Sequence, residues 1–287
     1  MKLRGIFTLL LVSCFSLGLM AQGVLDYDKK PSAEDDDIFI KHHNYEARPI
    51  PYPHLREADV MWTRRYWRKL DLRVKLNHPL YFPVQPIKDR KSLTEVIFNA
   101  VLEEGSITAY SDDEFSQVLT PEMIQKQLFR VDTTNDIDIV TGAEIFRVDT
   151  SKVLPGDVLE YLIKEDVFFD KKRSVMEFRI LGICPVANKT DPQTQEEYKE
   201  KLFWIWYPEA RPVLAQAESF NKANSAERRT FEQLFHMRMF SSTIIKEENV
   251  YDRDIFEYKK LSPMEQLLEA ERIENEIRNF EHDLWEY

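Results

Sequence analysis

Apolar side chains recur every three to four residues in several parts of the chain, which is the spacing that places them on one face of a helix. The clearest case follows Ser92, which forms a capping box with Glu95, and Gly105 stands where a C-cap glycine belongs. Thr120 and Pro121 are a typical cap and first residue of a second, shorter helix. Further helices are predicted over about residues 57–71, 225–239 and 262–287.

The predicted helix at 57–71 has apolar side chains on two sides. Its core ridge consists of Ala58, Trp62, Tyr66 and Leu70. Val60 and Trp67 lie roughly opposite this ridge, and Arg64 and Arg68 lie beside them. Two interpretations remain open for Trp67: loops of the same chain cover it, or it contacts a partner, because Trp and Arg are common interface anchors.

The middle of the chain is rich in β-branched and aromatic residues, which favour strands. Residues 158–169 and 175–184, separated by the polar residues 170–174, predict a β-hairpin. Residues 202–207 predict a strand that is apolar on both faces. Such a strand has to be covered on both sides, by helices of the same chain or by a neighbour.

Shorter stretches complete the predicted fold. The two prolines in 77–83 predict an extended path, and 242–245 predict a further strand. Residues 128–133 and 145–150 have similar sequences, which two strands with similar roles or a coincidence would explain. Together the elements predict an α+β fold, in which an antiparallel β-meander packs with several helices and a long C-terminal helix.

The C-terminal helix begins with a capping box of Ser262 and Glu265. Its apolar seam consists of Ala270, Ile273, Ile277, Phe280 and Leu284. The seam repeats with three- and four-residue spacing over about two heptads, as in a short coiled coil. Two interpretations remain open: the helix packs on its own domain, or it pairs with another subunit.

The N-terminus has the parts of a secretory signal peptide: Lys2 and Arg4, an apolar run to Leu19, and Ala21 before the expected cleavage site. The run is too short to span a bilayer. Cys14 closes a sequence similar to a lipobox, and its acylation is the alternative, although the apolar run continues past it. The expected divisions are a signal peptide at 1–21, an extended N-terminal segment at 22–55, an α+β domain at 56–261 and a C-terminal helix at 262–287.

Charge and cysteine content narrow the possible functions. The chain has 39 basic and 50 acidic residues, and cleavage after Ala21 would leave 37 basic residues against the same 50 acidic ones, a net charge of −13. This balance disfavours nucleic-acid binding and favours protein partners. Cys184 is then the sole cysteine, so no disulfide forms within the chain. By alternation it shares a strand face with Met176, Phe178 and Ile180, and we expect it to be buried.

Recognisable catalytic motifs are missing from the sequence. The glycines after the signal peptide stand at 23, 105, 142, 156 and 182. Phosphate-binding, dinucleotide-binding and serine-hydrolase motifs need glycines within about six residues of each other. HExxH and CxxC are absent as well. We therefore predict no catalytic residue, no cofactor and no metal. An enzyme with an unrecognised carboxylate site, and a lipid-surface protein that uses the basic and aromatic residues 64–69, remain the alternatives.

Four segments of the sequence resemble the GldN/PorN family. The longest are Glu57–Arg73 and Lys75–Pro83, and Leu202–Pro208 and Arg238–Ser242 add to them. The likeness extends from about Tyr27 to Asp254. Because these segments are long and unusual in composition, the resemblance is specific.

The resemblance implies a non-enzymatic structural or adaptor subunit, located in the periplasm and associated with the outer membrane. Members of this family form ring-shaped assemblies with an outer-membrane lipoprotein of the GldK/PorK type. They also contact the periplasmic part of an inner-membrane protein of the GldM/PorM type. The complex serves type IX secretion and, in some species, gliding, and membrane contact is indirect. We predict a partner interface that contains Trp62, Arg64, Arg65, Trp67, Arg68, Trp204 and Trp206.

Overall fold

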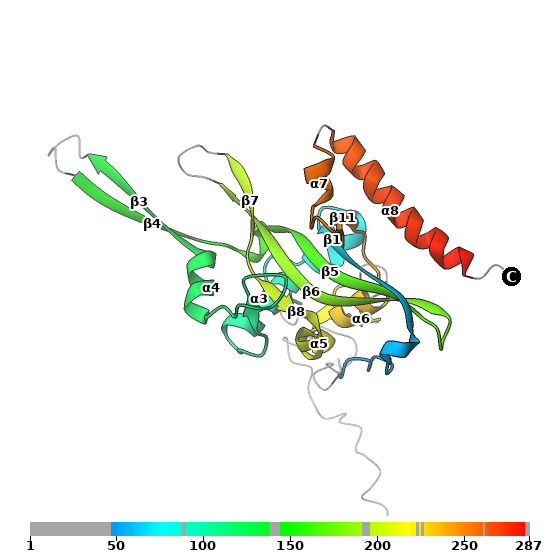
Figure 1. Cartoon of the computed structure of the whole chain (residues 1–287). Helices are drawn as coiled ribbons and strands as arrows, with labels where there is room; N and C mark the ends of the chain where they lie inside the picture. Colours follow the sequence, from blue (N-terminus) through cyan, green and yellow to red (C-terminus); the bar gives the residue numbers. More distant parts are fainter. Residues whose placement is uncertain are drawn as a thin grey trace, which may run out of the picture. The chain divides into compact units, whose positions relative to one another are not determined.

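The computed structural model of the chain describes residues 47–87, 90–137, 144–190, 196–221, 224, 227–260 and 262–284. All of them belong to one unit that begins at Asn44. The predicted signal peptide and most of the predicted extended N-terminal segment lie outside the described residues. Figure 1 shows the arrangement of the helices and strands.

An antiparallel sheet of seven strands forms the centre of this unit (Figure 1). Its main path is β11 (Thr243–Glu247), β1 (Val60–Asp71), β5 (Val158–Asp170), β6 (Val175–Thr190), β8 (Trp204–Trp206) and β2 (Ala109–Tyr110). The seventh strand, β7 (Glu197–Lys201), pairs with β6. The predicted hairpin is confirmed as β5 and β6, and the carboxylate of Asp170 accepts hydrogen bonds from the backbone N–H groups of Lys172 and Arg173 in its turn. The chain therefore has the predicted α+β fold.

The predicted helix at 57–71 is wrong. A single 3₁₀ turn, η2 (Glu57–Asp59), precedes β1, and β1 pairs with β5 along its length. Trp62, Tyr66 and Leu70 are spaced by four, and residues four apart share a side in a helix and in a strand alike. The spacing of this ridge therefore did not distinguish the two structures. The aromatic residues of the segment favour a strand, and pairing with the apolar β5 decides it.

Helices with strong local signals lie where they were predicted. The helix α3 (Leu93–Leu102) begins at Ser92, whose hydroxyl accepts a hydrogen bond from the Glu95 N–H, and Gly105 follows with a φ of +61°. The helix α4 (Pro121–Leu128) is capped by Thr120. The long helix α8 (Pro263–Asp283) closes the described chain.

Other helices differ from the prediction. The prolines at 77–83 do not keep that stretch extended, because η3 (Lys75–Asn77) and α2 (His78–Tyr81) place Pro79 in a first helical turn, where a missing N–H costs nothing. The helix predicted at 225–239 is shorter than expected. It is α6 (Phe231–His236), and it begins after a capping box at Thr230. The helix α5 (Tyr207–Gln216) begins directly after β8, and α7 (Ile255–Tyr258) precedes α8.

The two similar sequences at 128–133 and 145–150 lie in the paired arms of a separate hairpin. Its strands are β3 (Phe129–Ile137) and β4 (Glu144–Lys152), and Thr133 is the pairing partner of Val148. The residues between the arms lie outside the described part of the chain. The backbone pairing therefore favours two strands with similar roles over a coincidence.

Helices cover one face of the sheet, which we call the helix face. There, α3, α5 and α6 pack on Leu70, Tyr161, Ile163 and Ile183 in the largest core cluster. A second cluster joins Tyr66, Val167 and Phe169 to Ala270, Ile273 and Ile277 of α8. The seam of α8 therefore packs on its own domain, the first of its two open interpretations.

Cys184 lies on the opposite face, which we call the loop face. Lys164 pairs with Gly182 but Glu165 pairs with Ile180, so Leu181 is an extra residue in β6. This bulge reverses the alternation, and Cys184 packs with Leu162 and Trp204 instead of sharing a face with Ile180. The face was wrongly predicted, but the burial is confirmed, because Cys184 is fully buried.

Candidate functional site

The structure does not bring the seven predicted interface residues together. Along β1 the side chains alternate, so Trp62, Arg64 and Arg68 lie on the helix face with Tyr66. Arg65 and Trp67 lie on the loop face. The expectation that Arg64 and Arg68 border Trp67 is therefore wrong, and its cause is the helical interpretation of this segment.

Arg68 belongs to the core of the fold. Only 4% of it is exposed, and its Nε donates to Oε1 of Glu165 at 2.5 Å. Glu165 is fully buried and also accepts two hydrogen bonds from Arg238, at 2.7 and 3.2 Å. Glu274 of α8 lies 3.6 Å from the Arg68 guanidinium. Arg68 thus neutralises a buried carboxylate beneath α8 and is not available to a partner.

Trp62 and Arg64 are also engaged within the chain. The ring of Trp62 packs on Phe280, with 4.8 Å between the centroids, and Arg64 forms an ion pair with Glu247 at 3.3 Å. On β8, Trp204 is 5% exposed and packs beside Cys184, whereas Trp206 is 43% exposed. We predicted that this strand is covered on both faces. In the structure Trp206 of β8 is instead exposed to solvent.

Five residues form a row across the loop face, one from each of five neighbouring strands. In the order β11, β1, β5, β6 and β8 they are Lys246, Trp67, Lys164, Gly182 and Trp206. Each is the direct pairing partner of the next, so all five point to the same side of the sheet. We call them the Trp67 row. It joins Trp67 and Trp206, which are 139 positions apart in the chain, on one surface.

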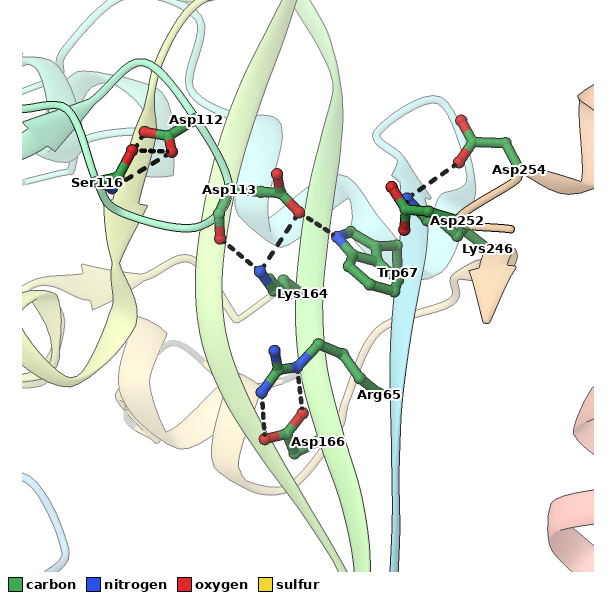
Figure 2. Close-up of polar contacts among 10 residues, drawn as sticks. All are labelled: Arg65, Trp67, Asp112, Asp113, Ser116, Lys164, Asp166, Lys246, Asp252 and Asp254. Carbon is green, nitrogen blue, oxygen red and sulfur yellow. Dashed lines mark hydrogen bonds and ion pairs between the residues drawn. The ribbon is translucent and has the colours of Figure 1, made fainter. Parts of the chain in front are cut away.

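The loop Ser111–Val118 crosses this row and is tied to it by Asp113. Figure 2 shows the Trp67 indole N–H donating to Oδ2 of Asp113 at 2.8 Å. The ammonium of Lys164 donates to the backbone oxygen of Asp113 at 2.6 Å and lies 3.4 Å from Oδ2 (Figure 2). Burial works to raise the pKa of Asp113, but the Trp67 hydrogen bond and the Lys164 charge outweigh it, and the pKa lies below its usual value.

Two ammonium groups lie close to the Trp67 ring. Lys246 Nζ is 4.6 Å from the ring centroid and Lys164 Nζ is 5.4 Å from it. Lys246 is held in turn by Asp252 at 2.7 Å and by Asp254 at 3.9 Å (Figure 2). Such cation–π contacts fix the orientation of the indole as well as adding attraction.

Phe115 fills the place that Gly182 leaves empty in the row. A Cβ at Gly182 would lie 2.6 Å from Cζ of Phe115, so no larger residue fits there without a shift. Phe115 itself has a φ of +59°, which is costly for a residue with a side chain. Asp112 holds the loop in this form by accepting hydrogen bonds from Ser116 (Figure 2). It also accepts one from the Gln117 N–H. The loop 111–118 is therefore held in a defined conformation over this part of the Trp67 row.

Arg65 continues the polar surface beside the row. Its guanidinium forms a two-point contact with Asp166 on β5, at 2.7 and 3.1 Å (Figure 2). The two residues are direct pairing partners, and about a third of each side chain is exposed. The loop face therefore presents fixed charges of both signs around its aromatic side chains.

This arrangement is suited to recognition and has no evident reaction centre. The carboxylates of Asp113, Asp166 and Asp252 beside the row each form an ion pair, and burial raises the pKa of the Cys184 thiol to about 12. Across the described ranges, no group of three or more His, Cys, Asp and Glu residues is placed to hold a metal ion. Aromatic side chains such as that of Trp206 are enriched in protein interfaces.

Sequence reasoning missed Asp113, Lys164 and Lys246. Each lies more than 40 positions from Trp67, so no local pattern links them. One signal was available: Lys164, Glu165 and Asp166 interrupt the apolar run of β5, and charged residues inside such a strand call for partners across the sheet. Without the register of β1, those partners could not be assigned.

No helix in the described part of the chain is long and apolar enough to cross a membrane.

Comparison with known protein families identifies a match over most of the chain. The sequence model of the family described as "Gliding motility associated protein GldN" matches residues 55–286. No curated protein matches the chain significantly.

Proposed function

Because the chain belongs to the GldN family of gliding motility associated proteins, we propose that it is a structural and adaptor subunit of the gliding and type IX secretion machinery. Gliding motility follows from the family, which is not a known enzyme family. The adaptor role and the link to type IX secretion are our extension of it. Both rest on the family resemblance and on the residues of the Trp67 row, which lie on the loop face.

The proposed partners are those that the resemblance implies. The chain assembles into rings with an outer-membrane lipoprotein of the GldK/PorK type and contacts the periplasmic part of a GldM/PorM-type protein. Its location is then the periplasm, next to the outer membrane, and it contacts the membrane through the lipoprotein. The predicted signal peptide, which would be cleaved after about Ala21, supports this location.

The observation that carries the proposal is the Trp67 row. It combines the half-buried Trp67, the exposed Trp206 and the ammonium group of Lys246 on the loop face, whereas Lys164 is only 4% exposed beneath the loop 111–118. Interface hot spots are enriched in tryptophan and are surrounded by groups that exclude water. Trp206 at the end of the row is the part most open to a partner.

Light scattering of the mature form, residues 22–287, tests the proposal. The protein is measured alone and after mixing with the lipoprotein partner expressed without its lipid. The proposal predicts a species much larger than a one-to-one complex. If the two proteins remain separate, also when the periplasmic part of the GldM/PorM-type protein is added, the adaptor role is rejected.

A further inference from the structure

A groove of about 510 Å³ runs along the free edge of the sheet at β11. One wall is made by Thr243, Ile244 and Ile245, which are consecutive residues. β11 has a bulge at Ile245, because Trp67 pairs with Lys246 but Arg68 pairs with Ile244, so its side chains do not alternate strictly between the two faces here. The groove is therefore bordered by side chains from both faces of this edge strand.

The edge of β11 is open to a further strand. Within the described residues β11 pairs with β1 and with no other strand. Every second residue of an edge strand directs its N–H and C=O groups away from the sheet, where they can pair with another chain. β11 is five residues long, about 17 Å, so two or three of its residues offer such groups, and the Glu247 oxygen already accepts a hydrogen bond from Nδ2 of Asn249.

The opposite wall is apolar and helical. Ile255 and Phe256 of α7 and Leu267 of α8 line it, and 67% of Phe256 and 57% of Leu267 are exposed. Further exposed apolar residues follow along the same helices: Tyr258, Met264 and Leu268. Several exposed apolar side chains on neighbouring helices are typical of a binding surface.

The charges around the groove select one kind of occupant. Lys69 lines it, and its ammonium has no ion pair with any described residue. Among the described residues of the lining, Asp254 is the one carboxylate, and it is directed to Lys246 at 3.9 Å. Lys69 interacts with Asp71 at longer range, so an acidic side chain of the occupant would add a direct partner for its ammonium group.

We propose that this groove binds an extended segment of a partner protein, which adds a strand to β11, places apolar β-branched side chains against α7 and α8, and sets an acidic residue beside Lys69. Main-chain hydrogen bonds to the edge supply affinity in this mode, and the alternate side chains supply specificity. The inference does not rest on the Trp67 row, although the two share β11, where Lys246 of the row contacts Asp254 of the groove.

Selection from a phage-displayed library of random twelve-residue peptides tests the proposal. The target is residues 22–287, and the comparison target carries Phe256→Lys and Leu267→Lys, two changes at exposed positions. We expect peptides without proline, with alternating Val, Ile or Thr and one Asp or Glu, to be enriched on the wild type alone. Tyr251→Lys, which is exposed but outside the groove lining, is the matched control and should select the same peptides.

Binding of a selected synthetic peptide then separates strand addition from simple apolar contact. N-methylation of alternate backbone nitrogens should weaken binding at least tenfold, because it removes the donors that pair with β11. Lys69→Gln should weaken binding of the acidic peptide about tenfold and leave its amide analogue unaffected. The proposal is overturned if no common peptide pattern emerges, if the Phe256→Lys/Leu267→Lys protein selects the same peptides, or if N-methylation has no effect. Thermal unfolding of each variant confirms that it is folded.

Discussion

The indole N–H of Trp67 donates to the carboxylate of Asp113 at 2.8 Å, and this bond ties the loop Ser111–Val118 to the sheet. Asp113→Ala removes the acceptor and leaves the indole and Lys164 without their partner. We expect a loss of about 1–2 kcal/mol in the free energy of unfolding. Amide hydrogen exchange should accelerate at residues 111–118 and stay unchanged in α3. Glu114→Ala, next to it on the exposed side, is the control, and equal exchange in both variants would contradict this role of Asp113.

The same contact makes stability depend on pH in the acidic range. The folded pKa of Asp113 lies below its usual value of 3.8, so the carboxylate is favoured in the folded chain. Its contribution is therefore present above about pH 4 and is lost as the pH falls through the folded value. The stability difference between the wild type and Asp113→Asn, measured by urea unfolding, should shrink from pH 5 to pH 2.5. A constant difference over that range would rule out this linkage.

Gly182 and Phe115 should show strong coupling. Gly182→Ala places a Cβ 2.6 Å from Cζ of Phe115, and we expect it to cost about 1–3 kcal/mol in the free energy of unfolding. Phe115→Ala removes the clashing ring and leaves a contact of 3.3 Å with Cε3 of Trp204, so in that background the Gly182→Ala change should cost less by about 1 kcal/mol or more. A double-mutant cycle by denaturant unfolding measures both values. Additive effects would show that Phe115 does not occupy this site in solution.

Arg68→Glu should prevent folding. A change at Arg65, on the opposite face of β1, should leave the protein folded. Arg68 neutralises the fully buried Glu165, so the substitution places two carboxylates together in the core. Losing one partner of a buried ion pair costs about 3–5 kcal/mol, and the added repulsion increases this value. Arg65→Ala breaks a half-exposed pair and should cost no more than about 1 kcal/mol. Circular dichroism and urea unfolding distinguish the two, and a folded Arg68→Glu protein would refute the core assignment.

Cys184 should be inert in the folded protein. It is fully buried behind Trp204, and its pKa of about 12 leaves almost no thiolate at pH 8. Iodoacetamide should modify residues 22–287 only as fast as the chain unfolds, and 6 M urea should make the thiol reactive within minutes. Rapid alkylation without denaturant would show that this part of the loop face opens.

The elements that the sequence predicted well are those with local causes. The caps at Ser92 and Thr120 and the polar turn at 170–174 are contained within a few residues, so α3, α4 and the β5–β6 hairpin could be placed. Trp62, Tyr66 and Leu70 could not decide between helix and strand, because a spacing of four fits both. The deciding factor was the pairing of β1 with β5, about 100 positions away.

The candidate site was predictable only in part for the same reason. Trp67 and Trp206 were chosen as bulky aromatic residues, and both lie in the Trp67 row. Arg68 was assigned to the wrong face because a helix was assumed. The position of Cys184 depended on the bulge at Leu181, which follows from the pairing of two strands and leaves no mark in either sequence alone.

The central claim is that the Trp67 row contacts the partner, and Trp206 offers its most direct test. Trp206 is 43% exposed, so Trp206→Ala should leave the free energy of unfolding within about 0.5 kcal/mol of the wild-type value. In light scattering with the lipid-free lipoprotein, we predict that this variant remains small where the wild type forms the large co-assembly. Phe220→Ala, at an aromatic residue of similar exposure outside the row, should assemble like the wild type. Normal co-assembly of a folded Trp206→Ala protein would contradict the claim.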